Sequence, residues 1–314
     1  MVFHSDPTSP GTGETVLLTG ARGFTGLHVR AALLEGGYRV VGAIAEHGSS
    51  LTALTADEVG LDITSLENCR SVMEAVRPDH VLHLAALSFV QHADPVAFYA
   101  VNVIGTLNLM QALVDAGVTP KRVLIASSAN IYGNATDGVL HETQPRAPVN
   151  HYAMSKLAME IMLKTWTERL PIVVTRPFNY TGVGQAPHFL VPKIVSHFVR
   201  RAQVIELGNL DVERDFSDVR FVAGAYRDLL AVECAGQTLN ICSGRPYSLR
   251  AIVAMMENIA GYKIEMRVNP AFVRENEVKI LIGSNARLTA LIGERNQIAL
   301  PDTLQWMVDD AIAV

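Results

Sequence analysis

Short runs of apolar, β-forming residues alternate with longer stretches of helical periodicity over the first half of the chain. The runs predicted as strands are 15–19, 38–44, 59–63, 81–86, 122–126 and 172–175. The stretches predicted as helices are 27–34, 65–76, 95–116 with an interruption at Gly105, and 150–168. Strands that alternate with helices form a parallel sheet through right-handed crossovers. The pattern therefore predicts an α/β protein built on a doubly wound parallel sheet.

The pattern changes after Asn179, where regular alternation of strands and helices stops. A predicted helix at 219–233 and a strand at 238–241 are expected to return to the first domain, and helices are predicted at 249–260 and 300–313. Residues 1–14 are rich in Ser, Pro, Thr and Gly and are predicted to form a flexible tail. A second, smaller α+β domain should therefore follow the sheet domain.

Composition restricts the classes of function. The chain carries a formal net charge of -5 and is 49% hydrophobic, with a pI near 6.1. An acidic chain of this kind is not expected to bind polymeric nucleic acid or an anionic membrane surface. Cys69, Cys234 and Cys242 are isolated, which predicts neither a metal site nor disulfides. We expect a soluble, cytoplasmic protein without a membrane span.

The segment after the first predicted strand is rich in glycine. It reads Gly20-Ala21-Arg22-Gly23-Phe24-Thr25-Gly26 and leads directly into the helix predicted at 27–34. In such a turn the first glycine permits the tight bend, the second lets the backbone approach a pyrophosphate, and the third lets helix and strand pack closely. The N-terminus of the helix offers N–H groups to the anion. The segment predicts a dinucleotide-binding turn.

The end of the second predicted strand bears on the choice between NAD and NADP. An acidic residue there would bind the adenosine ribose of NAD, but Ile44 and Ala45 occupy the position and Glu46 comes late. No arginine is present there to favour NADP. Arg22 in the glycine turn, or His47 with Ser49 and Ser50, could receive a 2′-phosphate, although a solvated loop charge explains Arg22 equally well. The cofactor is predicted to be NADP(H) rather than NAD(H).

Tyr152 and Lys156 lie four residues apart in the helix predicted at 150–168. This spacing places both side chains on one face. A free tyrosine has a pKa near ~10, and a neighbouring ammonium favours its ionised form. Such a phenol can donate a proton to a developing alkoxide and take one back. The pair is a candidate acid/base site.

Four candidate residues follow the ends of predicted strands. Gly20, Ala85, Ser128 and Asn179 come after the strands at 15–19, 81–86, 122–126 and 172–175. Ligands of open parallel sheets bind at the carboxyl ends of the strands, so these residues are expected to share one cleft. Asn102, in the predicted helix 95–116, would by itself be a polar helix residue that bonds to a neighbouring loop.

The chain from residue 15 onward resembles the extended short-chain dehydrogenase/reductase family. The resemblance rests on Thr19-Gly20-x-x-Gly23-Phe24-x-Gly26, Asp62, His83-Leu84-Ala85-Ala86, Asn102, Ser127-Ser128, Tyr152-x-x-x-Lys156 and Arg176-Pro177-x-Asn179. It implies a Rossmann dinucleotide-binding domain at 15–178 plus about 217–242, and a nucleotide-sugar domain at 179–216 plus 243–314. It also implies a homodimer formed through the helices that contain Asn102 and Tyr152.

The same resemblance assigns roles to individual residues. It implies that Ser128 orients a carbonyl, that Tyr152 is the acid/base, and that Lys156 binds the nicotinamide ribose and lowers the tyrosine pKa. The cofactor-binding residues that it implies are Gly20, Arg22, Gly23, Phe24, Thr25, Gly26, Asp62, Ile63, Leu84, Ala85, Ala86, Asn102, Ser127, Tyr152, Lys156 and Pro177.

A narrower resemblance, to the GDP-4-keto-6-deoxy-mannose reductases, lies in the second half. It rests on segments 176–185 and 208–219, on Arg274-x-x-Glu277-Val278 and on segment 283–288, while Tyr180 and Val183 depart from the pattern. It implies that Arg214 and Arg274 bind the ribose and diphosphate, that Glu277 binds a ribose hydroxyl, and that Asn179 binds the phosphate or sugar. A surface ion pair would explain Arg274 and Glu277 as well. The full set of predicted substrate residues is Ser88, Val90, Asn130, Asn179, Lys193, Arg214, Arg274 and Glu277.

Several activities are compatible with a serine, a tyrosine and a lysine in this arrangement. A 4,6-dehydratase also needs carboxylates after the catalytic serine, and Ala129 and Asn130 stand there instead. The first interpretation is an NAD(P)H-dependent reductase of a nucleotide-linked 4-keto-6-deoxy sugar, with GDP-4-keto-6-deoxy-D-mannose as substrate and GDP-D-rhamnose or its 6-deoxy-talose epimer as product. A 4-epimerase with tightly bound NAD is the alternative, followed by the dehydratase and a non-catalytic regulator.

Overall fold

The computed structural model describes residues 13–45, 53–88, 94–134, 138–272 and 280–313. The chain divides into two compact units. Unit 1 comprises the described residues of Met1–Ser128 together with Asn150–Thr175 and Ala223–Thr238. Unit 2 comprises the described residues of Ala129–Val149, Arg176–Val222 and Leu239–Val314.

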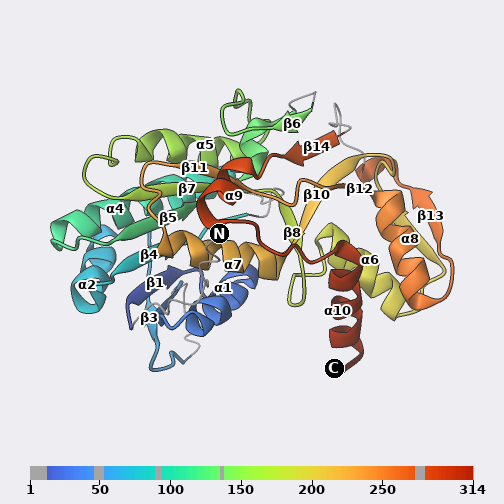
Figure 1. Ribbon diagram of the computed structural model, residues 1–314, viewed down its shortest axis with the longest axis horizontal. Coiled ribbons are helices and arrows are strands. Elements are labelled where there is room, and N and C mark those ends of the chain that lie inside the picture. The colour runs from blue at the N-terminus through green and yellow to red at the C-terminus, as the bar shows by residue number, and fades with distance from the viewer. Residues whose placement is uncertain (1–12, 46–52, 89–93, 135–137, 273–279, 314) are drawn as a thin grey trace, which may run out of the picture. The chain divides into compact units, whose positions relative to one another are not determined.

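A seven-stranded parallel sheet is built mainly from strands of unit 1 (Figure 1). Its strands are β1 (Thr15–Thr19), β2 (Arg39–Ile44), β3 (Glu58–Gly60), β4 (His80–His83), β5 (Arg122–Ala126), β7 (Ile172–Pro177) and β11 (Thr238–Ile241). Their order across the sheet is β11-β7-β5-β4-β1-β2-β3. The strand order therefore reverses between β1 and β4, and this is the position at which open α/β sheets bind ligands. The predicted doubly wound Rossmann fold is confirmed.

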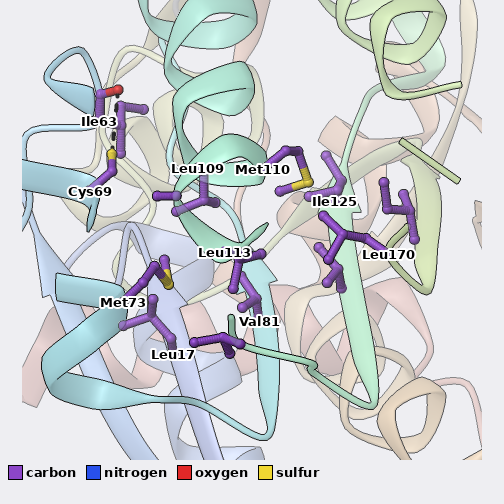
Figure 2. Close-up of a cluster of buried hydrophobic side chains, with 14 of the residues drawn as sticks. Leu17, Ile63, Cys69, Met73, Val81, Leu109, Met110, Leu113, Ile125 and Leu170 are labelled. Atoms are coloured by element: carbon purple, nitrogen blue, oxygen red, sulfur yellow. Dashed lines mark hydrogen bonds between the residues drawn. The ribbon is translucent and has the colours of Figure 1, made fainter. Parts of the chain in front are cut away.

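Helices cover both faces of the sheet (Figure 1). They are α1 (Phe24–Glu35), α2 (Leu66–Val76), α3 (Pro95–Tyr99), α4 (Thr106–Asp115), α5 (His151–Leu163) and α7 (Val219–Ala231). Helices α2, α4 and α5 share one apolar core with the sheet, in which Met73, Leu113 and Met159 are fully buried. Figure 2 shows part of this core, including Leu17 of β1. Each such side chain contributes roughly 1.5–3 kcal/mol relative to an exposed position.

The long helix predicted at 95–116 is divided. A π-helical turn, Ala100–Gly105, separates α3 from α4. The reason for glycine at 105 is close packing, because a Cβ there would lie 2.7 Å from Cδ1 of Ile63. The stretch Pro95–Asp115 is long and apolar enough to cross a membrane by length and composition alone, but Leu109 and Leu113 of its second half are buried in the sheet core.

Two other boundaries differ from the predictions in a way that affects the site. Strand β4 ends at His83, so 84–86 continue as irregular backbone and not as strand. Helix α5 begins at His151 because the side chain of Asn150 caps it by accepting from the N–H of Ala153 at 2.9 Å. It ends at Leu163, before the predicted end at 168.

Unit 2 contains more regular structure than the sequence predicted. A five-stranded sheet has the order β12-β10-β14-β6, with β8 paired to β10, and a second sheet pairs β13 with β9. Its strands are β6 (Val139–Leu140), β8 (Asn179–Thr181), β9 (Val204–Leu207), β10 (Glu213–Asp218), β12 (Pro246–Ser248), β13 (Glu265–Val268) and β14 (Ile280–Gly283). Most are three to six residues long and pair with strands that are distant in the sequence. The local pattern of strands and helices therefore did not predict them.

Helices α6 (Leu190–Val199), α8 (Leu249–Ala260), α9 (Ala286–Ile292) and α10 (Leu300–Ala313) complete unit 2, together with the 3-10 turns Ala129–Tyr132 and Pro270–Phe272. Ile194, Ile252 and Leu304, from α6, α8 and α10, form its apolar core with residues of β9 and β10. Helix α8 is capped at both ends, by the Ser248 side chain and by Gly261 in the left-handed conformation. Unit 2 is thus an α+β structure with its own core.

The division into units differs from the predicted domains at a few segments. Residues 129–149 fall in unit 2 because β6 pairs with β14, and 176–178, 217–222 and 239–242 are also assigned there. At the N-terminus, residues 1–12 lie outside the described residues. Glu14, predicted to be in the tail, accepts hydrogen bonds from Lys121 and at 2.8 Å from Nε2 of His80, so it belongs to the folded unit.

Candidate active site

The glycine turn between β1 and α1 has the geometry of a phosphate cradle. Gly20 adopts φ +71°, and a Cβ on it would lie 3.0 Å from the backbone nitrogen of Ala85. A Cβ on Gly26 would lie 2.1 Å from the carbonyl oxygen of Gly20. Gly23 is the N-cap of α1 and offers no side chain to the first-turn N–H groups. The turn therefore brings bare backbone and a helix N-terminus to the edge of the sheet.

We expect Gly26→Ala to weaken nicotinamide-dinucleotide binding at least tenfold. The added methyl cannot be placed without moving the backbone of Gly20 and Ala21, which are the atoms that shape the cradle. The measurement is a fluorescence titration with NADPH and NADH. Ala31→Gly, at an exposed position on the same helix, is the control: it costs the helix about 1 kcal/mol but leaves the turn intact. Equal losses in both variants would contradict the expectation.

The predicted cofactor residues of unit 1 lie where neighbouring parallel strands end. Gly20 follows β1, Asp62 and Ile63 follow β3, 84–86 follow β4, and Ser127 follows β5. The ends of β1 and β4 are tied together, because the N–H of Ala85 donates to Oγ1 of Thr19 at 3.0 Å. One edge of the sheet thus collects these residues, whereas the cleft predicted to contain Gly20, Ala85, Ser128 and Asn179 stays a prediction. Pro177 falls in unit 2.

Arg22 is held by a carboxylate that the sequence analysis did not consider. Its Nε and Nη2 donate to Glu58 at 3.0 and 2.6 Å, and Nη2 also donates to the carbonyl of Ala53 at 3.0 Å. These hydrogen bonds lower the pKa of Glu58 to about 2, so this carboxylate is charged at neutral pH. Its side chain is 3% exposed beneath an arginine side chain that is 33% exposed. The other candidates for a 2′-phosphate, His47, Ser49 and Ser50, lie outside the described residues.

Helix α5 buries Tyr152 and Lys156 on one face, as the four-residue spacing predicted. The tyrosine ring packs against Phe98, with ring centroids 6.2 Å apart. The Lys156 ammonium donates to the carbonyl oxygen of Ala126, the last residue of β5, at 2.7 Å. Burial lowers the pKa of Lys156 to about 8, and the charge of Glu160 one turn along the helix opposes this shift. A buried ammonium is thereby anchored beside the end of β5.

Ser127 and Ser128 come directly after β5 and are both buried. The N–H of Ser127 donates to the carbonyl of Thr175 at 2.7 Å, which extends the β5–β7 ladder by one residue. Its hydroxyl oxygen has no hydrogen-bond partner among the residues that the structure describes. A buried hydroxyl without a partner is costly in a folded protein, so a ligand atom is a natural partner for it.

Asn102, on the π-helical turn, is fully buried and makes three side-chain hydrogen bonds. Its amide oxygen accepts from the N–H of Leu87 at 2.9 Å, and its amide nitrogen donates to the carbonyl of Leu87 at 3.1 Å. The same nitrogen donates to Oγ of Ser155 at 3.0 Å, and that hydroxyl donates to the carbonyl of Tyr152 at 2.7 Å. The bond to a neighbouring loop that was expected of Asn102 is present, and the structure adds a link to α5.

The sequence analysis assigned no role to the polar side chains that support this edge. Thr106 and Ser155 were not singled out, and Thr19 and His83 were used only as parts of motifs. The only signal in the sequence for these residues was that each is a polar residue within an apolar or helical stretch. It was too weak on its own, because the partners are distant in the chain.

The predicted substrate residues are distributed over both units. Ser88 is exposed in unit 1. Asn130, Asn179, Lys193 and Arg214 belong to unit 2. There, the ammonium of Lys193 donates to the carbonyl of Glu206 at 2.8 Å, and the amide of Asn179 donates to the carbonyl of Asp215 at 3.2 Å. Val90, Arg274 and Glu277 lie outside the described residues. A shared substrate site stays a prediction.

Comparisons with known proteins place the chain among nucleotide-sugar enzymes. The family model described as GDP-mannose 4,6 dehydratase matches residues 17–307. GDP-6-deoxy-D-talose 4-dehydrogenase of Aggregatibacter actinomycetemcomitans is 38% identical over 279 residues, which cover 88% of this chain and 91% of that protein. GDP-6-deoxy-D-mannose reductase of Pseudomonas aeruginosa is 36% identical over 244 residues, which cover 74% and 80%.

Solved structures agree with this placement. A protein of Burkholderia cenocepacia J2315, provisionally described as an epimerase, is 47% identical with a TM-score of 0.90 and covers 97% of this chain and 99% of its own. RMD from Pseudomonas aeruginosa, solved in complex with NADPH, is 30% identical with a TM-score of 0.83 and covers 96% and 98%. The chain belongs to the GDP-mannose 4,6 dehydratase family, within the extended short-chain dehydrogenases/reductases, which are NAD(P)-dependent enzymes.

Proposed function

We propose that the protein is an NAD(P)H-dependent reductase of a nucleotide-linked 4-keto-6-deoxy sugar, with GDP-4-keto-6-deoxy-D-mannose as the first candidate substrate. The observation that carries the proposal is the buried pair of Tyr152 and Lys156 on α5, in the same unit as the glycine cradle and Ser128. The names of the two curated relatives support a GDP-linked deoxy sugar. They differ in the C4 epimer that they name, so GDP-D-rhamnose and the 6-deoxy-talose epimer are both candidate products.

The residues present fit a nicotinamide dinucleotide. A Cβ at Gly20 or Gly26 would collide with neighbouring backbone, so the turn presents bare backbone and the N-terminus of α1, and the Ser127 hydroxyl lacks a partner among the described residues. When bound, the cofactor would supply the hydride that reaches C4 of the sugar. The glycine turn would hold its pyrophosphate, Asp62 its adenosine end, and Lys156 the nicotinamide ribose.

The protein side chains would manage the proton and the developing charge. As the C4 carbonyl oxygen becomes an alkoxide, the Tyr152 hydroxyl would donate its proton to that oxygen, which yields the C4 alcohol. The Ser128 hydroxyl would stabilise the oxyanion by donating a hydrogen bond. The Lys156 ammonium would make the resulting tyrosinate less costly, because an opposite charge favours the ionised phenol.

A 4-epimerase with tightly bound NAD is the second candidate. The observation that favours it is the 47% identity to a protein provisionally described as an epimerase. Dehydration is disfavoured even though the family model bears a dehydratase name, because Ala129 and Asn130 follow Ser128 and neither exchanges protons near neutral pH. A non-catalytic regulator ranks last, because both Tyr152 and Lys156 are present.

One experiment separates these candidates. Purified protein is dialysed, its absorbance is examined for retained NAD, and it is then mixed with NADPH or NADH and GDP-4-keto-6-deoxy-D-mannose. The dTDP-, CDP- and UDP-linked 4-keto sugars serve as comparison substrates. A reductase consumes the reduced cofactor in proportion to product, whose C4 configuration is read by NMR. Retained NAD and interconversion of 4-epimers without net oxidation would instead identify the epimerase.

The cofactor is proposed to be NADP(H), and Glu58 offers a test. Glu58→Gln removes a negative charge that neutralises Arg22, so the NADPH dissociation constant is expected to fall about threefold to tenfold while that for NADH changes little. Asp57→Asn is the matched control, because the Asp57 side chain is 68% exposed and its charge is screened by water. An equal change for both cofactors would show that Arg22 does not meet a 2′-phosphate.

A cytoplasmic homodimer is also proposed. Val96 and Ile104, on the helical stretch that contains Asn102, and Met154 and Ile161, on α5, are exposed hydrophobic side chains. These are the two helices through which the resemblance implies dimerisation. Light scattering on the purified protein would measure the mass. Charged substitutions at Met154 and Ile161 are expected to give a monomer, and a wild-type monomer would contradict the proposal.

A further inference from the structure

A histidine with both ring nitrogens engaged lies in the interior of unit 1. His83, the last residue of β4, is 2% exposed. Its Nδ1 lies 2.8 Å from the hydroxyl oxygen of Thr19, at the end of β1. Its Nε2 lies 3.0 Å from the hydroxyl oxygen of Thr106, at the start of α4. The imidazole therefore joins two strand ends to a helix.

The neighbouring groups determine where each proton lies. The Thr106 hydroxyl is 2.8 Å from the carbonyl oxygen of Asn102, which can only accept, so the threonine donates there. Its oxygen must then accept a hydrogen from Nε2 of His83. In a neutral ring Nδ1 carries no proton and accepts from the Thr19 hydroxyl, whose oxygen accepts in turn from the N–H of Ala85. Each donor in this set of hydrogen bonds, from Ala85 to Thr106, thus has one acceptor.

Protonation of the ring would disrupt this set of hydrogen bonds. With both nitrogens as donors, the Thr19 hydroxyl would have to accept from the ring as well as from Ala85, and its own proton would lose its acceptor. Burial acts in the same direction and lowers the pKa of His83 to about 3, and the nearby Lys156 ammonium on α5 adds to the shift. The ring is therefore neutral at neutral pH.

The hydrogen bonds around His83 begin at the glycine turn and end near α5, the two elements that the proposed chemistry uses. Thr19 directly precedes Gly20 of the cradle, and Ala85 directly faces that glycine. At the other end, the Asn102 side chain binds Ser155, and Ser155 binds the carbonyl of Tyr152. Hydrogen bonds thus link the glycine turn through the imidazole to the backbone of Asn102, and the side chain of the same residue continues the connection to α5.

We propose that His83 is a positioning residue, held as the neutral Nε2–H tautomer, that fixes the cofactor edge formed by β1 and β4 to the helices behind it. Both of its ring nitrogens are engaged by protein hydroxyl groups, so its role is to position other groups. The proposal rests on the proposed function for the identity of this edge as the cofactor site. The assignment of the tautomer does not depend on that function.

The first test is a spectroscopic signature. In protein labelled with ¹⁵N-histidine, the His83 resonances are assigned among the 10 histidines by their loss in His83→Gln. We expect Nε2 to be protonated and Nδ1 unprotonated, without change from about pH 5 to pH 8, where an ordinary histidine titrates. A ring that titrates in this range, or an Nδ1–H tautomer, would overturn the proposal.

The second test measures cofactor binding in matched variants. Thr106→Val removes the hydroxyl at nearly constant shape, whereas Thr106→Ser keeps it. We expect the valine variant to raise the dissociation constants of NADPH and NADH roughly tenfold, and the serine variant to change them less than threefold. His83→Leu should weaken binding at least as much as Thr106→Val. Unchanged binding in a folded Thr106→Val or His83→Leu protein would overturn the positioning role.

The outcomes stay separable if a variant does not fold or the proposed function fails. The tautomer is measured on the wild-type protein, so an unfolded His83→Leu variant leaves the first test decisive. If wild-type protein binds neither NADPH nor NADH, the proposed function fails, and with it the assignment of this edge to a cofactor. The protonation pattern of His83 would still be judged by its resonances.

Discussion

Replacing Tyr152 by phenylalanine is expected to lower turnover by about 10²–10⁴-fold, the range over which a positioned acid/base group acts. The ring would keep its contact with Phe98, and the backbone carbonyl at 152 would keep its hydrogen bond from Ser155. The variant should therefore fold normally and bind NADPH or NADH within about twofold of wild type. Steady-state kinetics at saturating cofactor, together with a binding titration, measure the two quantities.

Tyr99→Phe is the matched control for this substitution. Tyr99 also lies next to α5, where its hydroxyl is within 3.1 Å of Nδ1 of His151, but nothing assigns it to the reaction. It should retain near-normal turnover. Substantial activity in the Tyr152 variant would remove the proton-transfer role. Loss of cofactor binding in that variant would point to a structural role for the phenol instead.

Lys156→Met is expected to reduce cofactor-dependent activity by at least 10²-fold and, at the same time, to stabilise the cofactor-free protein. The folded protein buries this ammonium, and its pKa of about 8 lies below the ordinary lysine value of 10.5, so folding disfavours the charged form. An apolar side chain of similar length removes that cost and loses the hydrogen bond to Ala126. The net gain should be on the order of 2 kcal/mol near pH 7.

The pH dependence of stability provides a separate check on whether the buried Lys156 ammonium destabilises the folded protein. Between about pH 8 and pH 10.5 the unfolded chain binds a proton at Lys156 that the folded protein has released, so this group makes wild-type stability rise with pH in that window. The methionine variant should lack this rise. In the wild type, cofactor affinity should fall as pH increases through about 8, because the ammonium is lost.

Chemical denaturation of the cofactor-free proteins at several pH values measures these stabilities. Lys164→Met is the control, since Lys164 is exposed at the C-terminal end of α5 and should affect neither activity nor stability by much. A Lys156 variant that is less stable than wild type would show that the ammonium is a net stabilising group. The interpretation of its burial would then be wrong.

Sequence reasoning predicted the sheet unit well because its signals are local. The run 15–19, the glycines at 20, 23 and 26 and the helix that follows all lie within a few residues of one another, and the backbone requires glycine at Gly20 and Gly26. The four-residue spacing of Tyr152 and Lys156 determines their common face once the helix exists. In unit 2 the helices predicted at 249–260 and 300–313 are present as α8 and α10, but most strands were not predicted, because short strands such as β6 and β14 become visible only through their pairing.

The sequence by itself determined the doubly wound fold, the glycine turn and the placement of candidate chemistry at strand ends. Only the tertiary structure decided which polar groups meet. Thr19 and His83 are 64 residues apart, Asn102 and Ser155 are 53 apart, and Arg22 and Glu58 are 36 apart. Periodicity and turn chemistry act over one element, whereas these contacts depend on how several elements pack. For that reason the neutral imidazole and the carboxylate on Arg22 could be found only in the folded chain.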